Sequence, residues 1–178
     1  MSGVRRVITG VSGSPGSLRA LRYAAEVAKV RGALLIPVLA WVPPGGDLAD
    51  RRCPSVYLRE TWRTAAVERL TECIDLAFGG PPADIVMQPA VLRGEAGQVL
   101  ASAACEPGDM IVVGTGRRGA IERMIGGHVA RYCLAHASCP VVAVPPAELE
   151  QASRGLRGWA FRHRAVTPDD ALHAAGSR

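Results

Sequence analysis

The clearest structural signal in the chain is Met110–Pro146, MIVVGTGRRGAIERMIGGHVARYCLAHASCPVVAVPP. It holds a short apolar run (Met110–Val113), a loop rich in Gly and Arg, a helical pattern and a second apolar run (Val141–Val144). Glycines let backbone N–H groups approach a phosphate closely, and a helix N-terminus adds about half a positive charge. The stretch therefore predicts a strand, loop, helix and strand that form one half of a nucleotide-binding α/β unit.

Upstream of this stretch, apolar runs alternate with helical patterns. Ser14 is a good N-cap and Pro15 a good first residue for the first helix, and Gly32 ends it after Arg31. Strands alternating with helices at crossover lengths of ten or more residues predict a parallel, doubly wound sheet with helices on both faces. The predicted strands are Val4–Val11, Ala33–Val42, Ile85–Leu92, Met110–Val113 and Val141–Val144, and the upstream helices are Pro15 to about Arg31, Val56–Phe78 and Gly94 to about Cys105.

Prolines mark irregular places in this pattern. Pro37 removes a hydrogen-bond donor from the second strand, so a bulge or an edge-like pairing is expected there. Pro89 interrupts the third strand, and Asp47–Pro54 is expected to be a polar loop. In the helix Val56–Phe78, the apolar spacing predicts an inward face made of Leu58, Trp62, Ala65, Ala66, Leu70, Cys73 and Ala77.

Length and composition predict one domain with an extension. The chain has 178 residues, of which 48% are hydrophobic and 21% charged, as in globular proteins. We expect a domain at residues 1–146 and a C-terminal extension at residues 147–178, which is either a flexible tail or a segment that docks Trp159 and Phe161. No apolar run reaches the about 18 residues of a membrane helix, and the N-terminus lacks a signal-peptide apolar region, so a cytoplasmic protein is expected.

The charge and the cysteines exclude some classes of function. The net charge is +5, but the arginines are scattered and only 4% of residues are aromatic, which argues against nucleic acid as a partner. Lys29 is the only lysine among 21 basic residues, so an arginine bias in composition explains the charge. Five cysteines without a CxxC pair indicate a reducing compartment.

The segment Gly114–Val129 resembles the nucleotide loop of the universal stress protein family. That loop is a glycine, two residues, a glycine, nine residues, and a glycine followed by Ser or Thr. Gly114 and Gly127 match the first and third glycines, whereas Arg117 and His128 occupy the second glycine and the Ser/Thr positions. The closing SCPVVAVP is also similar to the family's last strand. The resemblance covers about Val4–Pro146 and implies a Rossmann-like, five-stranded parallel sheet of order 3-2-1-4-5, related to the adenine nucleotide alpha hydrolases.

In that topology the chain reverses direction between the first and fourth strands, and ligands bind at the carboxyl ends beside such a switch point. The loops that start at Gly10 and at Gly114 would lie side by side there. The resemblance implies an adenine nucleotide, ATP with or without Mg²⁺, with phosphates at the second loop and the nucleoside on apolar strand ends. The candidate nucleotide-binding residues are Gly10, Val11, Ser12, Ala40, Val113, Gly114, Gly116, Arg117, Gly119, Gly127, His128 and Val129.

The departures from the family pattern leave alternatives open. Ser12 stands where the family usually carries an acid. Arg117 either blocks the space of the missing glycine or binds a phosphate directly. The main hypothesis is a dimeric ATP-binding stress-response module with little or no turnover, and the alternative is a nucleotide-independent dimeric scaffold. An ATP-using enzyme of the pyrophosphatase superfold is the third hypothesis, although Ser12–Ser17 lacks that loop's second glycine and aspartate.

The sequence predicts a protein partner but no catalytic or metal-binding residue. The last strand, Val141–Val144, is expected at a sheet edge, where the family pairs two copies across a two-fold axis, so a homodimer is expected. His128, Cys133, His136 and Cys139 superficially suggest a metal site. Cys133 also belongs to an apolar helical face, so we expect no metal there.

Overall fold

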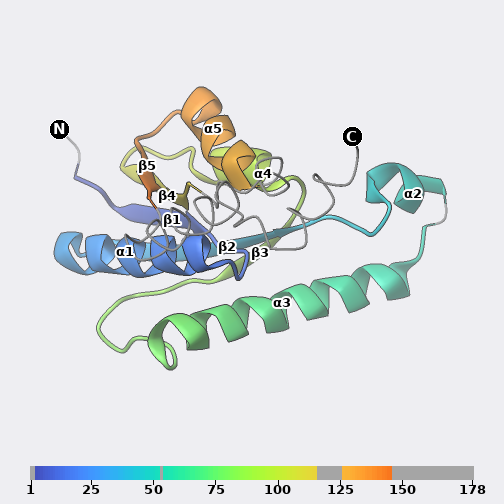
Figure 1. Cartoon of the computed structure of the whole chain (residues 1–178), viewed down its shortest axis with the longest axis horizontal. Helices are drawn as coiled ribbons and strands as arrows, with labels where there is room; N and C mark the ends of the chain where they lie inside the picture. Colours follow the sequence, from blue (N-terminus) through green and yellow to red (C-terminus); the bar gives the residue numbers. More distant parts are fainter. Residues whose placement is uncertain (1–2, 53, 116–125, 146–178) are drawn as a thin grey trace, which may run out of the picture. The chain divides into compact units, whose positions relative to one another are not determined.

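The strands form one parallel sheet in the predicted order. The computed structural model describes residues 3–52, 54–115 and 126–145, and its described part contains a five-stranded sheet of order β3-β2-β1-β4-β5. Figure 1 shows β1 in the middle of the sheet, between β2 and β4. Pairing is in regular parallel register, so that Ile8 of β1 lies between Ile36 and Ile111. The strands are β1 (Arg6–Gly10), β2 (Leu34–Trp41), β3 (Ala90–Arg93), β4 (Asp109–Gly114) and β5 (Val141–Val144).

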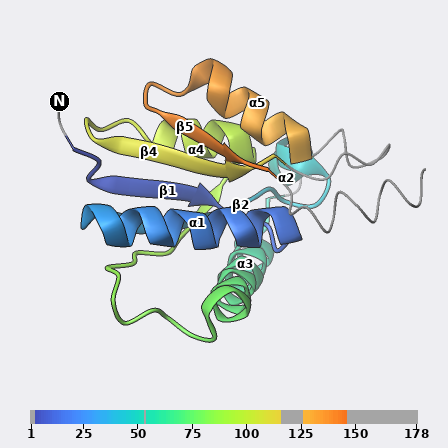
Figure 2. The same cartoon turned by 60° about the vertical axis from the view of Figure 1, so that its left-hand side comes forward.

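Helices cover both faces of the sheet, as Figure 2 shows. The helices are α1 (Pro15–Arg31), α2 (Gly46–Arg52), α3 (Val56–Phe78), α4 (Ala96–Ala103) and α5 (Gly126–His136). Successive side chains of a strand point to opposite faces. Val7 therefore packs with α1 and α3 in one core cluster, whereas Ile8 packs with α4 and α5 in the other.

The ends of α1 follow the sequence signals. The Ser14 hydroxyl accepts a hydrogen bond from the Ser17 amide at 3.2 Å, and Pro15 begins the helix. Gly32 ends it with a φ of 61°, a conformation that glycine adopts at little cost. This places the first turn of α1 directly after the carboxyl end of β1.

Pro37 of β2 is regularly paired on the side of β1, but it faces an interruption of the pairing on the side of β3. Its pairing with Thr9 of β1 is continuous, so β2 has no bulge there. The amide and carbonyl of Leu35 both bond to the chain before β3, at Val86 and Gln88. Because main-chain groups two residues apart point to the same side, Pro37 also faces β3, where pairing is interrupted between Met87 and Ala90. The missing donor thus faces a gap in the ladder.

Three local predictions were wrong in whole or in part. The strand predicted at Ile85–Leu92 is shorter, since β3 spans Ala90–Arg93 and only an isolated bridge at Met87 precedes it. Residues 47–54 were expected to be a loop, but Gly46–Arg52 forms α2 because Asp50 is held by arginines from α3 and β3. The inward face predicted for α3 begins too early, since Leu58 is 43% exposed and Ala65 is exposed. Ala66, Leu70 and Cys73 of the predicted face are buried, together with Ile74, where the helix packs on the sheet and on α1.

Several sequence predictions lie outside the described residues. These include the extension at residues 147–178 and part of the nucleotide loop, residues 116–125. Within the residues that are described, no helix combines the length and the apolar character needed to cross a bilayer.

Candidate functional site

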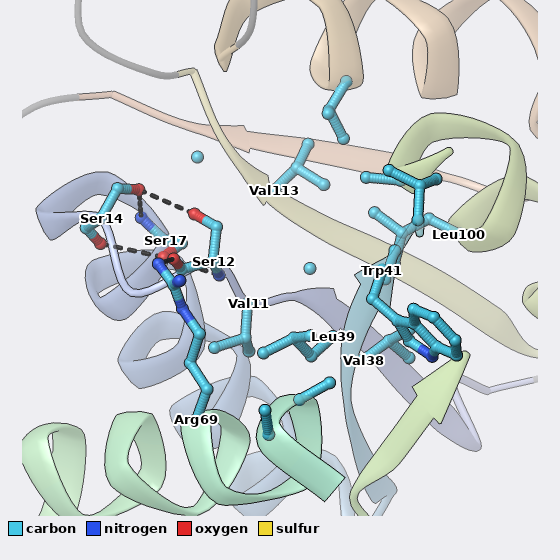
Figure 3. Close-up of a pocket in the computed structure, with 18 residues that line it drawn as sticks. Val11, Ser12, Ser14, Ser17, Val38, Leu39, Trp41, Arg69, Leu100 and Val113 are labelled. Carbon is cyan, nitrogen blue, oxygen red and sulfur yellow. Dashed lines mark hydrogen bonds between the residues drawn. The ribbon is translucent and has the colours of Figure 1, made fainter. Parts of the chain in front are cut away.

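A cavity of about 520 Å³ opens at the carboxyl ends of β1, β2 and β4 (Figure 3). This is the switch point of the sheet, because β1 lies between β2 and β4. The size lies within the range of small-molecule sites. The predicted residues that line the cavity are Gly10, Val11, Ser12, Ala40, Val113, Gly114 and Val129.

The other predicted residues are placed elsewhere or are not described. His128 lines a smaller neighbouring cavity of about 370 Å³, together with Glu95, Gln98 and Tyr132. Gly127 lies in the first turn of α5. Gly116, Arg117 and Gly119 fall outside the described residues, so both hypotheses for Arg117 remain predictions.

Two glycines of the site serve close packing between elements. A Cβ on Gly114 would lie 2.6 Å from the Gly16 carbonyl oxygen, against the backbone of the first turn of α1. A Cβ on Gly10 would lie 2.8 Å from Cδ1 of Leu100, which belongs to α4. From sequence, glycine was expected to make room for a phosphate. At Gly114 the absent side chain makes room for the first turn of α1 beside the end of β4 at the cavity.

Residues from α3 and α4 complete the walls, and sequence reasoning missed them. The apolar lining includes Val38, Leu39, Trp41, Ala65, Ala66, Ala96 and Leu100. Trp41 directly follows the predicted residue Ala40, which was a usable signal. The residues of α3 and α4 carried no such sequence signal, because their spacing indicates only that a helix face points inward and not that this face borders a cavity.

One corner of the cavity is polar and carries a positive charge. The Ser12 amide donates to Ser17 Oγ at 3.2 Å, and the Ser12 and Ser14 hydroxyls lie 3.1 Å apart. Arg69 reaches over from α3, and its Nη2 donates to the Ser12 carbonyl at 2.9 Å. Figure 3 shows these groups together on one side of the cavity, with Trp41 on the other. Among the described lining residues, Arg69 is the only charged side chain.

An ion-pair cluster supports the Trp41 wall. The Arg93 guanidinium lies 5.9 Å from the centre of the Trp41 ring, within cation–π range. Both Arg93 and Arg59 donate to Asp50 of α2 at 2.9 Å, and the Asp50 side chain is only 4% exposed. The hydrogen bond from Arg59 outweighs burial and, with Arg93, lowers the pKa of Asp50. Asp50 therefore stays ionised, and its ion pairs with Arg59 and Arg93 hold α2 next to Trp41.

The Cys and His residues after the loop make packing contacts in the described part of the chain. Cys133 is fully buried in the core under α4, and its Sγ lies 3.9 Å from the Gly97 carbonyl. The His136 ring stacks on Tyr132, with centroids 4.1 Å apart. Burial raises the pKa values of Cys133 and Cys139, so both remain thiols at neutral pH. In the described ranges, no three His, Cys, Asp or Glu side chains gather closely enough to hold a metal ion.

Comparison with known proteins agrees with this architecture. The model of the universal stress protein family matches residues 3–145. No curated protein matches the chain by sequence.

Similar solved structures share the fold at low sequence identity. A universal stress protein in complex with cAMP is 22% identical, with a TM-score of 0.52, over 81% of this chain and 98% of that one. UspA from Lactobacillus plantarum is 17% identical, with a TM-score of 0.59, over 81% of this chain and 99% of that one. A universal stress protein from Archaeoglobus fulgidus is 24% identical, with a TM-score of 0.50, over 79% of this chain and 98% of that one. With the family model matched across the sheet and all the described helices, the chain belongs to the universal stress protein family.

Proposed function

We propose that this protein is a dimeric stress-response module that binds an adenine nucleotide in the switch-point cavity, with little or no turnover. The observation that carries the proposal is the cavity itself. It lies where open α/β sheets bind ligands, and it has apolar walls with a polar, cationic corner. A nucleoside suits the walls, and a phosphate suits the corner.

Two further observations support this assignment. One structure of similar fold was solved with cAMP, so the family's fold accommodates a nucleotide. The described lining offers hydroxyls and one guanidinium but no carboxylate, histidine or thiol to act as a general base or nucleophile. This favours binding over catalysis. A Mg²⁺ ion prefers oxygen ligands, so the phosphate oxygens of ATP would be its main negatively charged ligands in this cavity.

The test is nucleotide content together with affinity. The purified protein is denatured and its supernatant is analysed for adenine nucleotides, and Mg-ATP, AMP and adenosine are titrated into native protein by calorimetry. We expect co-purified nucleotide or saturable binding in about the micromolar range. Neither bound nucleotide nor heat up to about 1 mM ligand would overturn the proposal and favour the nucleotide-independent scaffold.

Two neighbouring positions on α3 provide a matched pair of variants. Ala65 lines the cavity, whereas Thr64 is exposed and does not. Ala65→Trp should fill part of the cavity and abolish binding, and Thr64→Trp should leave the affinity unchanged. Equal affinities in the two variants would show that the ligand binds somewhere else.

The dimer is proposed to form through β5. Among the described residues, β5 pairs with β4 only, so its other side is an open edge. The Pro140 carbonyl accepts from Ile111 of β4, and the Val144 carbonyl accepts from Thr115, directly after β4, while Ile111 pairs with Val141. By strand alternation, the backbone groups of Val141 and Ala143 therefore point outward.

This alternation gives a precise test of the dimer. Ala143→Pro removes an outward amide while leaving the hydrogen bonds to β4 in place, and Ala143→Ser keeps that amide. Light scattering should find a dimer for the wild type and for Ala143→Ser, and a weakened dimer for Ala143→Pro. A wild-type monomer at all concentrations would refute this part of the proposal.

A further inference from the structure

The cavity has a distinct polarity from one end to the other. Trp41 and Leu100 make one end apolar, whereas Ser12, Ser14 and Arg69 make the other end polar and positive (Figure 3). No carboxylate belongs to the described lining, and no salt bridge joins Arg69 to a carboxylate among the described residues. Within the described part of the chain, no carboxylate therefore neutralises the charge of Arg69 where it meets the cavity.

The contacts of Arg69 place its guanidinium over the loop between β1 and α1. Nη2 donates to the Ser12 carbonyl at 2.9 Å. A Cβ on Gly13 would lie 3.5 Å from the same Nη2 and 3.7 Å from Nε, which are ordinary van der Waals distances, so the guanidinium packs directly against this loop. A guanidinium carries five N–H donors in a planar fork, and one bond to a neutral carbonyl uses only one of them. The fork geometry matches the oxygens of a phosphate.

We propose that Arg69 is a phosphate-binding residue of this cavity, assisted by the hydroxyls of Ser12 and Ser14. The inference rests on the proposed function and specifies where a phosphate of the nucleotide binds. That place is the corner beside the β1–α1 loop, in addition to the glycine-rich loop after β4. Binding should therefore favour nucleotides over the bare nucleoside, and the preference should depend on Arg69.

The test compares ligands that differ only in phosphate across matched variants. Adenosine, 5′-AMP, 3′-AMP and inorganic phosphate are titrated into the full-length wild type, Arg69→Gln, Arg69→Lys and Arg63→Gln. Arg63 is the control, because it lies on the same helix, pairs with Glu60 on the surface and does not line the cavity.

Arg69→Gln should weaken at least one of the two AMP isomers about five- to tenfold while changing adenosine less than about twofold. Arg69→Lys should retain part of the affinity, and Arg63→Gln should match the wild type. The affected isomer identifies which phosphate contacts Arg69. Binding of inorganic phosphate that is lost in Arg69→Gln would also support the site, because it shows that phosphate alone is recognised. Raising the salt concentration should weaken AMP binding more in the wild type than in Arg69→Gln.

Other outcomes would overturn the inference in distinguishable ways. Equal losses for adenosine and both AMP isomers would mean that Arg69 only holds the Ser12 loop in place. Unchanged binding of all ligands would mean that the phosphate lies elsewhere, with the proposed function still standing. If wild-type protein binds neither adenosine nor AMP, the proposed function fails together with this inference.

Discussion

Replacing Gly114 by alanine should move the first turn of α1 away from the end of β4. The new Cβ would lie 2.6 Å from the Gly16 carbonyl oxygen, 2.8 Å from its carbon and 3.3 Å from the Ser17 amide. Carbon contacts are favourable at about 3.5 Å, so the two elements must separate by roughly 0.8 Å. All three atoms belong to the backbone, and no side-chain rotation relieves the overlap.

The expected cost combines two opposing effects. Overpacking of this kind costs about 1–3 kcal/mol, and the lower entropy of the unfolded alanine chain returns about 0.4–1 kcal/mol. We expect a net loss of about 1–2 kcal/mol in the free energy of unfolding, or about 2–8 °C in Tm. Because β4 ends and α1 begins at the cavity, the affinity for the proposed nucleotide should fall as well.

Urea unfolding followed by far-UV circular dichroism measures this loss, with Gly10→Ala as the control. There the new Cβ meets the tip of the Leu100 side chain at 2.8 Å, and that tip can rotate toward the adjoining cavity. Gly10→Ala should therefore cost less than about 1 kcal/mol. If Gly114→Ala were as stable as the wild type, or more stable than Gly10→Ala, the close approach of β4 and α1 would be refuted.

Three further predictions concern stability. Burial favours a raised pKa for Asp109, whose side chain is 1% exposed, but hydrogen bonds from Arg6 and the Glu106 amide outweigh it and lower the pKa. The ionised Asp109 carboxylate therefore stabilises the fold above about pH 4, and this stabilisation is lost as the pH falls further. Asp109→Asn should lower the free energy of unfolding by about 3 kcal/mol at pH 7 and make stability depend less on pH in the acid range. Ser14→Ala removes the N-cap of α1 and should lower the free energy of unfolding by about 1 kcal/mol in urea. An unchanged stability would contradict the capping role of Ser14. Thr9→Val replaces a buried hydroxyl that has no described partner and should be neutral or stabilising by up to about 1 kcal/mol, whereas a clear Tm decrease would reveal a partner.

The accuracy of the sequence predictions depended on the range of the interactions. The helix α1 was predicted to within its caps because the Ser14 hydroxyl and the Gly32 backbone act within a few residues. The helix α2 was missed because Asp50 is held by arginines 9 and 43 residues further along the chain. No local pattern in residues 47–54 contains that information.

The candidate site shows the same division. Strand ends and their glycines could be identified from the sequence, because apolar runs and turn residues are local signals. The contribution of α3 could not, since Arg69 meets Ser12 across 57 residues of chain. The packing role of Gly114 could not be predicted either, because the atoms that fill its missing side-chain space belong to a helix that precedes it by almost a hundred residues.

The sequence by itself determined the alternation of strands and helices, the helix caps and, through its glycine-rich loop, the family. These are products of local backbone preferences and apolar periodicity. Only the tertiary structure decided which side chains meet at the switch point: Trp41 supported by Arg93 at one end and Arg69 over Ser12 at the other. The physical reason is that a parallel sheet gathers the carboxyl ends of strands distant in sequence at one edge, where helices from both faces also converge.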